Sequence, residues 1–235
     1  MIKFVKILRF NNGLKEELED KIVKERNINL YLNDKLIERI VYSPPYEEEL
    51  VFGYLFLKGY INKKNDLKRI VFKDEDKGHC TDCHTEVENI SDNFLLLEKQ
   101  FSINSSKLFV LMKELLSKSI VFRQTGGTHI SGLSDGQNLI SFFEDVSRQS
   151  TIFKLAGDAI LTDKWPDANV LFTSGRISET AVQYAKRLGV MAVVSRSAPT
   201  DFAIEVAKDA DIMLIGFLRG SRFNIYSTNK NLKII

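Results

Sequence analysis

Both cysteines of the 235-residue chain, Cys80 and Cys83, lie three positions apart in the stretch GHCTDCHTE at residues 78–86. Two of the three histidines, His79 and His84, belong to the same stretch. A cysteine that serves packing behaves as a small apolar residue and normally sits within an apolar run, whereas this stretch follows the charged run KDEDK. The concentration of thiols and imidazoles therefore predicts chemistry for this segment.

The pair Cys80-x-x-Cys83 admits several kinds of chemistry, and its surroundings argue against two of them. A thioredoxin-like pair sits at a strand-to-helix turn in a βαβ unit, and the polar residues 73–93 lack that pattern. A deaminase zinc site places H-x-E well before P-C-x-x-C. Here HTE at 84–86 follows the cysteines, and His79 stands where the proline should be. Half of a structural zinc site stays open, although it needs two further ligands.

The remaining interpretation is a thiolate carried on a mobile arm. Residues 73–93 are mostly polar, so we expect a mobile loop or an irregular hairpin there. Cationic or imidazole neighbours favour the thiolate, which is the nucleophilic form of cysteine. Lys77, His79 and His84 are close enough in sequence to act on Cys80 in this way. We therefore predict nucleophilic sulfur chemistry at this segment and no bound metal.

Arginine recurs in the short loops that follow apolar runs in the second half of the chain. Runs at residues 169–174, 190–195 and 211–218 have the composition of parallel strands covered on both faces. Ligands of open parallel sheets bind at the carboxyl ends of the strands, and the arginine fork suits phosphate oxygens. The loops after these runs, with two further sites of the same kind, contribute Arg176, Arg196, Arg219, Arg222, Arg123 and Arg148.

These loops also contain glycine, which lets backbone N–H groups approach an anion. Gly126-Gly127 is one such pair, and Gly220 lies in the last loop. No G-x-G-x-x-G or Walker A motif is present, so neither a standard nicotinamide site nor a P-loop is predicted. A single arginine is usually a surface charge, but the repetition predicts a polyphosphate or dinucleotide ligand. The acids Glu144-Asp145 are usually exposed, and a carboxylate there could also accept from a guanine.

The periodicity of the chain predicts an α/β protein with two lobes. In residues 101–235, strand-like apolar runs alternate with amphipathic helical segments, which predicts an open sheet with right-handed crossovers. Residues 1–100 predict a smaller α+β lobe that carries the cysteine loop. Its expected elements are a hairpin turning at Asn33-Asp34, a helix over SPPYEEELVFGYLFLKGYI, and strands at LKRIVF and NFLLLE. Parallel central strands are expected at 170–173, 190–194 and 212–216.

The sequence also indicates where several helices begin and end. Asn104 is expected to cap the helix over NSSKLFVLMKELLSKS, and further helices are expected to begin near Ser178 and Thr200. In the helix expected over SPPYEEELVFGYLFLKGYI, Pro45 suits the first turn and Gly59 suits the C-terminal end.

The composition excludes several broad classes of protein. Hydrophobic residues make up 44% and charged residues 27% of the chain, as in ordinary soluble globular proteins. The net charge of +2 gives no reason to expect nucleic acid or a membrane surface as partner. No apolar run approaches the roughly 20 residues of a membrane-spanning helix. The start MIKFVKILRFNNG is too short and too charged for a secretion signal. We expect a cytoplasmic protein with reduced thiols.

Several motifs together resemble a known family. FRQTGGTH, EDVSRQSTIFK, TSGRIS, VVSRSAPT and GFLRGSRFNIY occur in this order, preceded by the C-x-x-C and by SPPYEEELVFGYLFLKGYI. The combination resembles the formate dehydrogenase accessory sulfurtransferase family (FdhD/NarQ) over about residues 28–228. The resemblance implies a cytidine deaminase-like three-layer α/β/α fold without the deaminase zinc site, and a homodimer.

The resemblance also implies a function. Members take persulfide sulfur from a cysteine desulfurase and deliver it to the bis-molybdopterin guanine dinucleotide cofactor, for which GDP would be a mimic. The client would be the catalytic subunit of a molybdenum or tungsten formate dehydrogenase. Cys80 would carry the persulfide and Cys83 would assist. The family's cofactor-binding segment corresponds to Phe217, Leu218, Arg219, Gly220, Ser221 and Arg222, with Gly126, Gly127, Arg176, Arg196 and Arg148 expected around it.

The chain departs from the family pattern in two places. Gln149 stands where the family has histidine after EDV, and His79 and His84 replace glycines that usually flank the cysteine pair. Glutamine can hydrogen bond but cannot titrate, and we expect the Gln149 side chain to face the cofactor pocket. Two alternatives remain open: a cofactor-binding chaperone that does not use the thiols, and a zinc-binding interaction module in which Cys80 and Cys83 pair with a second copy.

Overall fold

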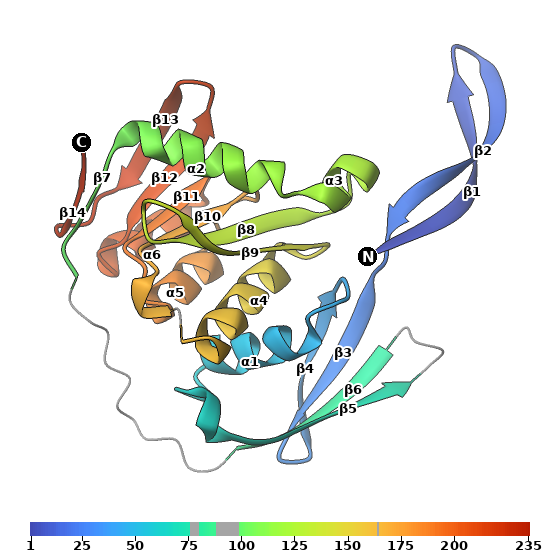
Figure 1. The fold of residues 1–235 in the computed structure, drawn as a ribbon, viewed down its shortest axis with the longest axis horizontal. Coiled ribbons are helices and arrows are strands. Elements are labelled where there is room, and N and C mark those ends of the chain that lie inside the picture. The colour runs from blue at the N-terminus through green and yellow to red at the C-terminus, as the bar shows by residue number, and fades with distance from the viewer. Residues whose placement is uncertain (76–79, 88–98, 164) are drawn as a thin grey trace.

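The computed structural model describes residues 1–75, 80–87, 99–163 and 165–235. The strand predicted at NFLLLE, together with Lys77 and His79, lies outside these described residues. A six-stranded sheet forms the centre of the fold, in the order β13-β12-β11-β10-β8-β9 (Figure 1). Its strands are β8 (His129–Ser134), β9 (Leu139–Asp145), β10 (Val170–Thr173), β11 (Ala192–Ser195), β12 (Met213–Arg219) and β13 (Arg222–Ser227).

The three apolar runs form the parallel core of this sheet. β10, β11 and β12 pair in parallel, which confirms the prediction, and all four residues of both β10 and β11 are buried. The outer strands are antiparallel: β13 pairs with β12, β8 with β10 and β9 with β8. The sheet is therefore mixed, and the sequence had not indicated these three outer strands.

Helices cover both faces of the sheet, so the fold has the three layers that were expected (Figure 1). The α2 helix (Ser105–Ser117) packs Leu108, Leu111 and Leu115 into one apolar cluster with the sheet. On the opposite face, α4 (Arg148–Leu161), α5 (Glu179–Arg187) and α6 (Asp201–Asp209) contribute to a second cluster. The N-caps follow the sequence, since Asn104, Ser178 and Thr200 each accept a hydrogen bond from the first helical turn.

The N-terminal part adds a second sheet and a helix. The sheet has the order β4-β3-β6-β5, and the hairpin between β3 and β4 turns at Asn33-Asp34 as predicted, with both residues at positive φ. The α1 helix (Glu47–Leu57) follows a cis Pro44–Pro45 bond, so Pro45 precedes the helix and does not sit in its first turn. The strands are β3 (Arg26–Leu32), β4 (Lys35–Tyr42), β5 (Leu67–Glu75) and β6 (Cys80–Val87).

The α1 helix joins the two parts of the chain by packing closely on α4. A Cβ atom built on Gly53 would lie 1.7 Å from the carbonyl oxygen of Phe153, and one on Gly157 would lie 1.9 Å from that of Glu49. Two glycines therefore allow the helix backbones to touch. One apolar cluster runs from Ile28 of β3 through α1 to the central sheet, so the parts on either side of residue 100 share a core. The boundary at residue 100 stays a prediction.

Five smaller elements and one long ribbon complete the fold. They are α3 (Ile120–Thr125), the short parallel pair β7 (Phe101–Ile103) and β14 (Leu232–Ile234), and the 3-10 turns at Lys64–Asp66 and Trp165–Asp167. The ribbon pairs β1 (Ile2–Asn11) with β2 (Leu14–Val23) and projects from the body of the molecule (Figure 1). Within the described residues, no helix is long and apolar enough to cross a membrane.

Candidate functional site

The cysteine pair lies on a regular strand, and the predicted loop or irregular hairpin is therefore corrected for residues 80–87. β6 pairs in parallel with β3, where Cys80 is opposite Asn27 and Cys83 is opposite Leu30. It also pairs antiparallel with β5. Thr81, Cys83 and Thr85 are buried whereas Cys80 is only partly buried. This alternation is the ordinary consequence of a strand with one face on a core.

The two thiols therefore have different environments. Cys83 is fully buried in the apolar cluster beneath the sheet, and burial raises the pKa of its thiol to about 12. A thiol in such a place is inert, because it stays protonated at neutral pH. Cys80 is partly exposed at the first position of the strand. The expectation that Cys83 assists Cys80 is not supported by this geometry.

The spacing of the pair also argues against a shared metal or disulfide. Three steps along a strand cover about 10 Å, whereas a disulfide needs Cα atoms within about 7 Å. Side chains three positions apart on a strand point to opposite faces. Among the described residues, no three His, Cys, Asp or Glu side chains gather in a way that could hold a metal.

His84 does not neighbour Cys80, contrary to expectation. Its ring stacks on Tyr31 with centroids 4.6 Å apart and planes 8° from parallel, and its Nδ1 lies 4.0 Å from a carboxylate oxygen of Asp34. Four steps along β6 separate it from Cys80, about 13 Å in a strand. Asp82 lies between them on the same face and accepts a 2.9 Å hydrogen bond from Asn29.

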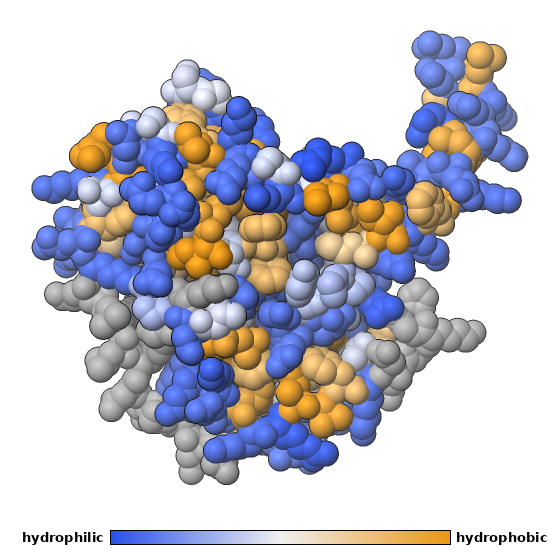
Figure 2. Space-filling model, viewed as in Figure 1, coloured by the Kyte–Doolittle hydropathy of each residue, from blue (hydrophilic) through white to orange (hydrophobic). Residues whose placement is uncertain are grey.

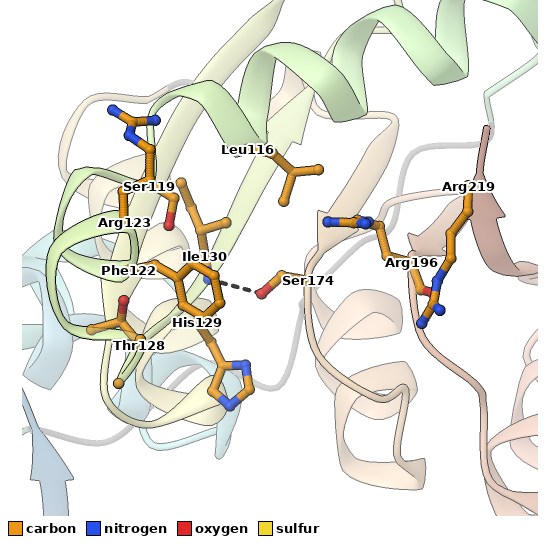
Figure 3. Close-up of a pocket in the computed structure, with 12 residues that line it drawn as sticks. Leu116, Ser119, Phe122, Arg123, Thr128, His129, Ile130, Ser174, Arg196 and Arg219 are labelled. Carbon is orange, nitrogen blue, oxygen red and sulfur yellow. Dashed lines mark hydrogen bonds between the residues drawn. The ribbon is translucent and has the colours of Figure 1, made fainter. Parts of the chain in front are cut away.

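A cavity of about 640 Å³ opens beside the ends of β10 and β11, between α3 and the turn that follows β12 (Figure 3). Gly126, Gly127, Arg196 and Arg219, all predicted from the sequence, line it together. The Arg219 Nε donates a 2.7 Å hydrogen bond to the carbonyl oxygen of Arg196, which holds the two arginines side by side. The residues that line this arginine cavity are Leu116, Ser119, Phe122, Arg123, Gly126, Gly127, Thr128, His129, Ile130, Ser174, Arg196 and Arg219.

Other predicted residues lie outside this lining. Leu218 is buried in the apolar cluster against α2, and Gly220, at positive φ, belongs to the tight turn where Arg219 pairs with Arg222. Arg148 lies near the cavity residue His129: its side-chain carbons and the Nδ1 of His129 both come within 3.6 Å of a Cβ position at Gly175. The predicted residues that do not line the cavity are Phe217, Leu218, Gly220, Ser221, Arg222, Arg176 and Arg148.

Sequence reasoning missed His129, Ser174 and Phe122 as cavity residues. Burial lowers the pKa of His129 from its ordinary 6.5, and the neighbouring Arg148 guanidinium lowers it further. Ser174 accepts a 3.0 Å hydrogen bond from the Ile130 N–H, a contact that does not use its own hydroxyl proton. The signal for His129 was its position directly after the Gly-Gly-Thr of the predicted anion loop.

The acids Glu144 and Asp145 both make contacts within the fold, and these contacts do not support the guanine-binding interpretation of the pair. Glu144 accepts from the backbone N–H groups of Val121 and Phe122 at 3.0 and 2.6 Å and so anchors α3. It also accepts from the hydroxyls of Ser119 and Thr128. Both carboxylate oxygens are thus occupied within the fold.

Asp145 forms a fully buried ion pair with Lys154, with Nζ and Oδ2 2.6 Å apart. The Lys154 ammonium also donates to the Ser43 carbonyl oxygen, and the Ser43 N–H donates to Asp145. This network ties the segment before α1 to α4 and β9. Its role is to hold the N-terminal part against the central sheet.

Gln149 does not face the arginine cavity, so that expectation is also wrong. Its side chain is exposed on the first turn of α4 and lines a separate cavity of about 400 Å³ with Glu38, Lys58 and Tyr184. The Lys58 ammonium of that cavity lies 5.7 Å from the ring centroid of Tyr184.

Cys80 and the arginine cavity lie at neighbouring parts of the fold. The Cγ1 of Val23, at the end of β2, lies 2.9 Å from where a Cβ on Gly127 would stand, and the Lys21 Nζ donates a 2.9 Å hydrogen bond to Gln124 of α3. Four residues further on, Asn27 is paired with Cys80. Four residues span at most about 14 Å, and paired strands lie about 5 Å apart. The Cys80 backbone is therefore within about 20 Å of Val23 at the cavity wall.

Comparison with known proteins agrees with this architecture. The chain is 30% identical over 253 residues to the sulfur carrier protein FdhD of Listeria monocytogenes, covering 97% of each chain. It is 31% identical over 244 residues to the protein of that name from Sulfolobus acidocaldarius, covering 96% of each. A crystal structure from Desulfotalea psychrophila, described as a formate dehydrogenase accessory protein, superposes with a TM-score of 0.83 at 23% identity, covering 98% of this chain and 99% of that one. The FdhD/NarQ family model matches residues 23–94 and 77–233, and the chain therefore belongs to the FdhD/NarQ family.

Proposed function

We propose that this chain is a sulfurtransferase that carries sulfur as a persulfide on Cys80. It accepts the sulfur from a cysteine desulfurase and delivers it to a bis-molybdopterin guanine dinucleotide cofactor held in the arginine cavity. The cofactor is cargo, destined for a formate dehydrogenase. The relatives named sulfur carrier protein FdhD support the carrier role. The setting is the cytoplasm, where thiols stay reduced.

The observation that carries this proposal is the contrast between the two cysteines. Cys83 is fully buried and Cys80 is partly exposed at the start of β6. Only an accessible thiol can meet a donor protein, so among the two cysteines of the chain the carrier is Cys80. The β6 strand of Cys80 begins beside the segment that leads from Val23 at the cavity wall, which supports loading and delivery of sulfur from neighbouring parts of the fold.

The loading step is a thiol–persulfide exchange. The Cys80 thiolate attacks the outer sulfur of the donor persulfide, the donor S–S bond breaks, and the donor cysteine leaves as a thiolate. One sulfur atom moves and the number of S–S bonds is unchanged, so the step needs no external oxidant or reductant. Cys83 takes no part, because its thiol is buried and directed to the other face of the sheet.

The cavity residues suit the anionic arms of the proposed cargo. Arg196 and Arg219 present guanidinium groups at one wall (Figure 3), and guanidinium binds phosphate oxygens with paired hydrogen bonds. The Ser174 hydroxyl adds a group that can donate to an anion, whereas the Gly126 and Gly127 N–H groups already donate to the Phe122 carbonyl oxygen and the Thr125 hydroxyl. A volume of about 640 Å³ lies within the usual range of about 300–1,000 Å³ for small-molecule sites.

Mass spectrometry after incubation with a desulfurase and cysteine tests the carrier role. The wild-type chain should gain about 32 Da, one sulfur atom, at the thiolate nucleophile. Cys80→Ser should gain nothing and should fail to activate a client formate dehydrogenase, while still binding GDP. The matched control is Cys83→Ala, which should gain the mass and support activation once its stability has been checked.

Two results would favour the alternatives. If Cys80→Ser activates the client as well as the wild type, the chain acts as a cofactor-binding chaperone without thiol chemistry. If the purified protein holds stoichiometric zinc that is lost in Cys80→Ser, an interaction module bridging two copies replaces the carrier.

A homodimer is part of the proposal, and the β1–β2 ribbon supports it. Two-stranded ribbons are marginally stable alone, and this one exposes Phe4, Leu8 and Phe10 at 59%, 51% and 64%. Figure 2 shows apolar residues along the projecting ribbon. Sedimentation of the wild type should give the mass of two copies, and Phe4→Ser with Leu8→Ser should shift the protein toward monomer. A wild-type chain that sediments as a monomer at all concentrations contradicts this part.

A further inference from the structure

The arginine cavity has two unlike ends (Figure 3). Leu116 and Phe122 of α2 and α3, with Ile130 of β8, form the apolar part of one end. Arg123 lines the cavity at the same end, where its guanidinium donates a 2.7 Å hydrogen bond to the Ser117 carbonyl oxygen. Arg196 and Arg219 form a cationic end on the opposite side, with Ser174 between the two ends (Figure 3). A ligand that carries a flat apolar part and an anionic part at separate positions would match these two ends.

Phe122 is the aromatic side chain of the apolar end, and it is half exposed. Its relative exposure is 51% although it lies in a helix whose neighbour Val121 is 8% exposed. Single exposed aromatic side chains are common on protein surfaces. This ring differs from them because it lines a cavity and lies across from two guanidinium groups (Figure 3).

The fold anchors the backbone that carries this ring. The Phe122 N–H donates a 2.6 Å hydrogen bond to Glu144, and the Val121 N–H donates to the other oxygen of the same carboxylate at 3.0 Å. At the other end of α3, Gly126 adopts positive φ at 68° and ends the helix. An exposed ring on an anchored backbone loses little conformational freedom when a ligand covers it, which favours binding.

We propose that Phe122 is the stacking platform for the flat ring of the ligand, a purine nucleoside diphosphate whose phosphates bind Arg196 and Arg219. This inference rests on the proposed function, which supplies a cargo with guanine dinucleotide arms. The face of a nucleobase stacks on an aromatic side chain and leaves its edges free for other contacts. The ring thus selects ligands with a base over bare phosphates, and the arginines bind both.

Calorimetry with two ligands, GDP and inorganic pyrophosphate, separates the two ends of the cavity. Phe122→Ala should weaken GDP binding by at least about fivefold, the lower limit of base–aromatic stacking. It should leave pyrophosphate affinity within about twofold of the wild type. The control is Phe202→Ala on α6, since Phe202 is 61% exposed but lies outside the cavity lining, and it should change neither ligand.

Two further variants keep the test decisive. If Phe122→Ala does not fold, Phe122→Leu keeps the apolar bulk without the ring and should show the same selective loss of GDP. Phe122→Trp should keep the affinity for GDP. Stacking of guanine should quench the fluorescence of the added tryptophan, which is measured after the fluorescence of the native Trp165 is subtracted.

The outcomes distinguish the inference from the proposed function. If Phe122→Ala and Phe122→Leu bind GDP as tightly as the wild type while Arg196→Ala and Arg219→Ala lose it, the stacking platform is wrong and the anion site stands. If loss of the ring weakens GDP and pyrophosphate equally, the ring shapes the cavity in general and the inference is overturned. If the wild-type chain binds neither ligand, the cargo site and the platform both fail.

Discussion

Cys80 and Cys83 lie on the same strand, β6, and face opposite sides of its sheet: Cys83 is fully buried in the core and Cys80 is partly exposed. A C-x-x-C motif at a helix start brings its two thiols together, but on a strand the same spacing separates them. The motif therefore supplies one accessible thiol and one core residue.

The first prediction follows from this separation. Under native conditions, iodoacetamide should alkylate Cys80 and leave Cys83 unmodified, because burial raises the pKa of Cys83 to about 12. In denaturant both cysteines should react. Peptide mass spectrometry measures the two sites separately. Mild oxidation of the folded protein should produce no Cys80–Cys83 disulfide, since the strand keeps their Cα atoms about 10 Å apart; such a disulfide in high yield would contradict the strand assignment.

The second prediction concerns the arginines. Arg196→Ala and Arg219→Ala should each weaken GDP binding by about 1.5–3 kcal/mol, the usual value of a hydrogen bond to a charged group. Arg222→Ala is the matched control, because it lies three residues from Arg219 but outside the cavity lining. Titration calorimetry at fixed salt gives the affinities. Equal losses in all three variants would mean that net charge, not the cavity, governs binding.

The third prediction is a pH dependence of stability. Burial and Arg148 hold the pKa of His129 below 6.5 in the folded protein, so the unfolded chain binds the proton more tightly. The free energy of unfolding should therefore fall as the pH drops below about 6.5, down to the lowered folded pKa. Urea denaturation at pH 7.5, 6.5 and 5.5 measures it. His129→Gln should lose this contribution. The free energy of unfolding of the wild type minus that of the variant should therefore become smaller as the pH falls. A difference that stays constant with pH would contradict the prediction.

The fourth prediction tests the buried ion pair. Lys154→Met leaves the Asp145 carboxylate without its ammonium partner in a fully buried site, and breaking a buried pair in this way costs about 3–5 kcal/mol. The double variant Asp145→Asn/Lys154→Met removes both charges and should recover part of the loss. Chemical denaturation of the three proteins gives the free energies of unfolding. If Lys154→Met is as stable as the wild type, the pair does not hold α4 to the segment before α1.

Local sequence determined the elements that depend on near neighbours. The apolar runs predicted the parallel strands β10, β11 and β12, because strands covered on both faces must be apolar along their whole length. Asn104, Ser178 and Thr200 marked helix starts, since a cap bonds within its own first turn. The β1–β2 ribbon was missed although Asn12-Gly13, both at positive φ, is the usual hairpin signal.

Tertiary structure decided which of the polar residues meet. Arg219 lines the cavity while Arg222, its partner across the turn at Gly220, lies outside the lining, because the hydrogen bond from its Nε to the Arg196 carbonyl oxygen holds the Arg219 side chain there. Glu144 anchors α3 through contacts with residues at least 16 positions away in the chain. The motif around Cys80 and Cys83 was visible in the sequence, but only pairing with β3 and β5 made it a strand and buried one thiol. Chemistry follows residue type, whereas exposure and neighbours follow from long-range pairing that local sequence does not encode.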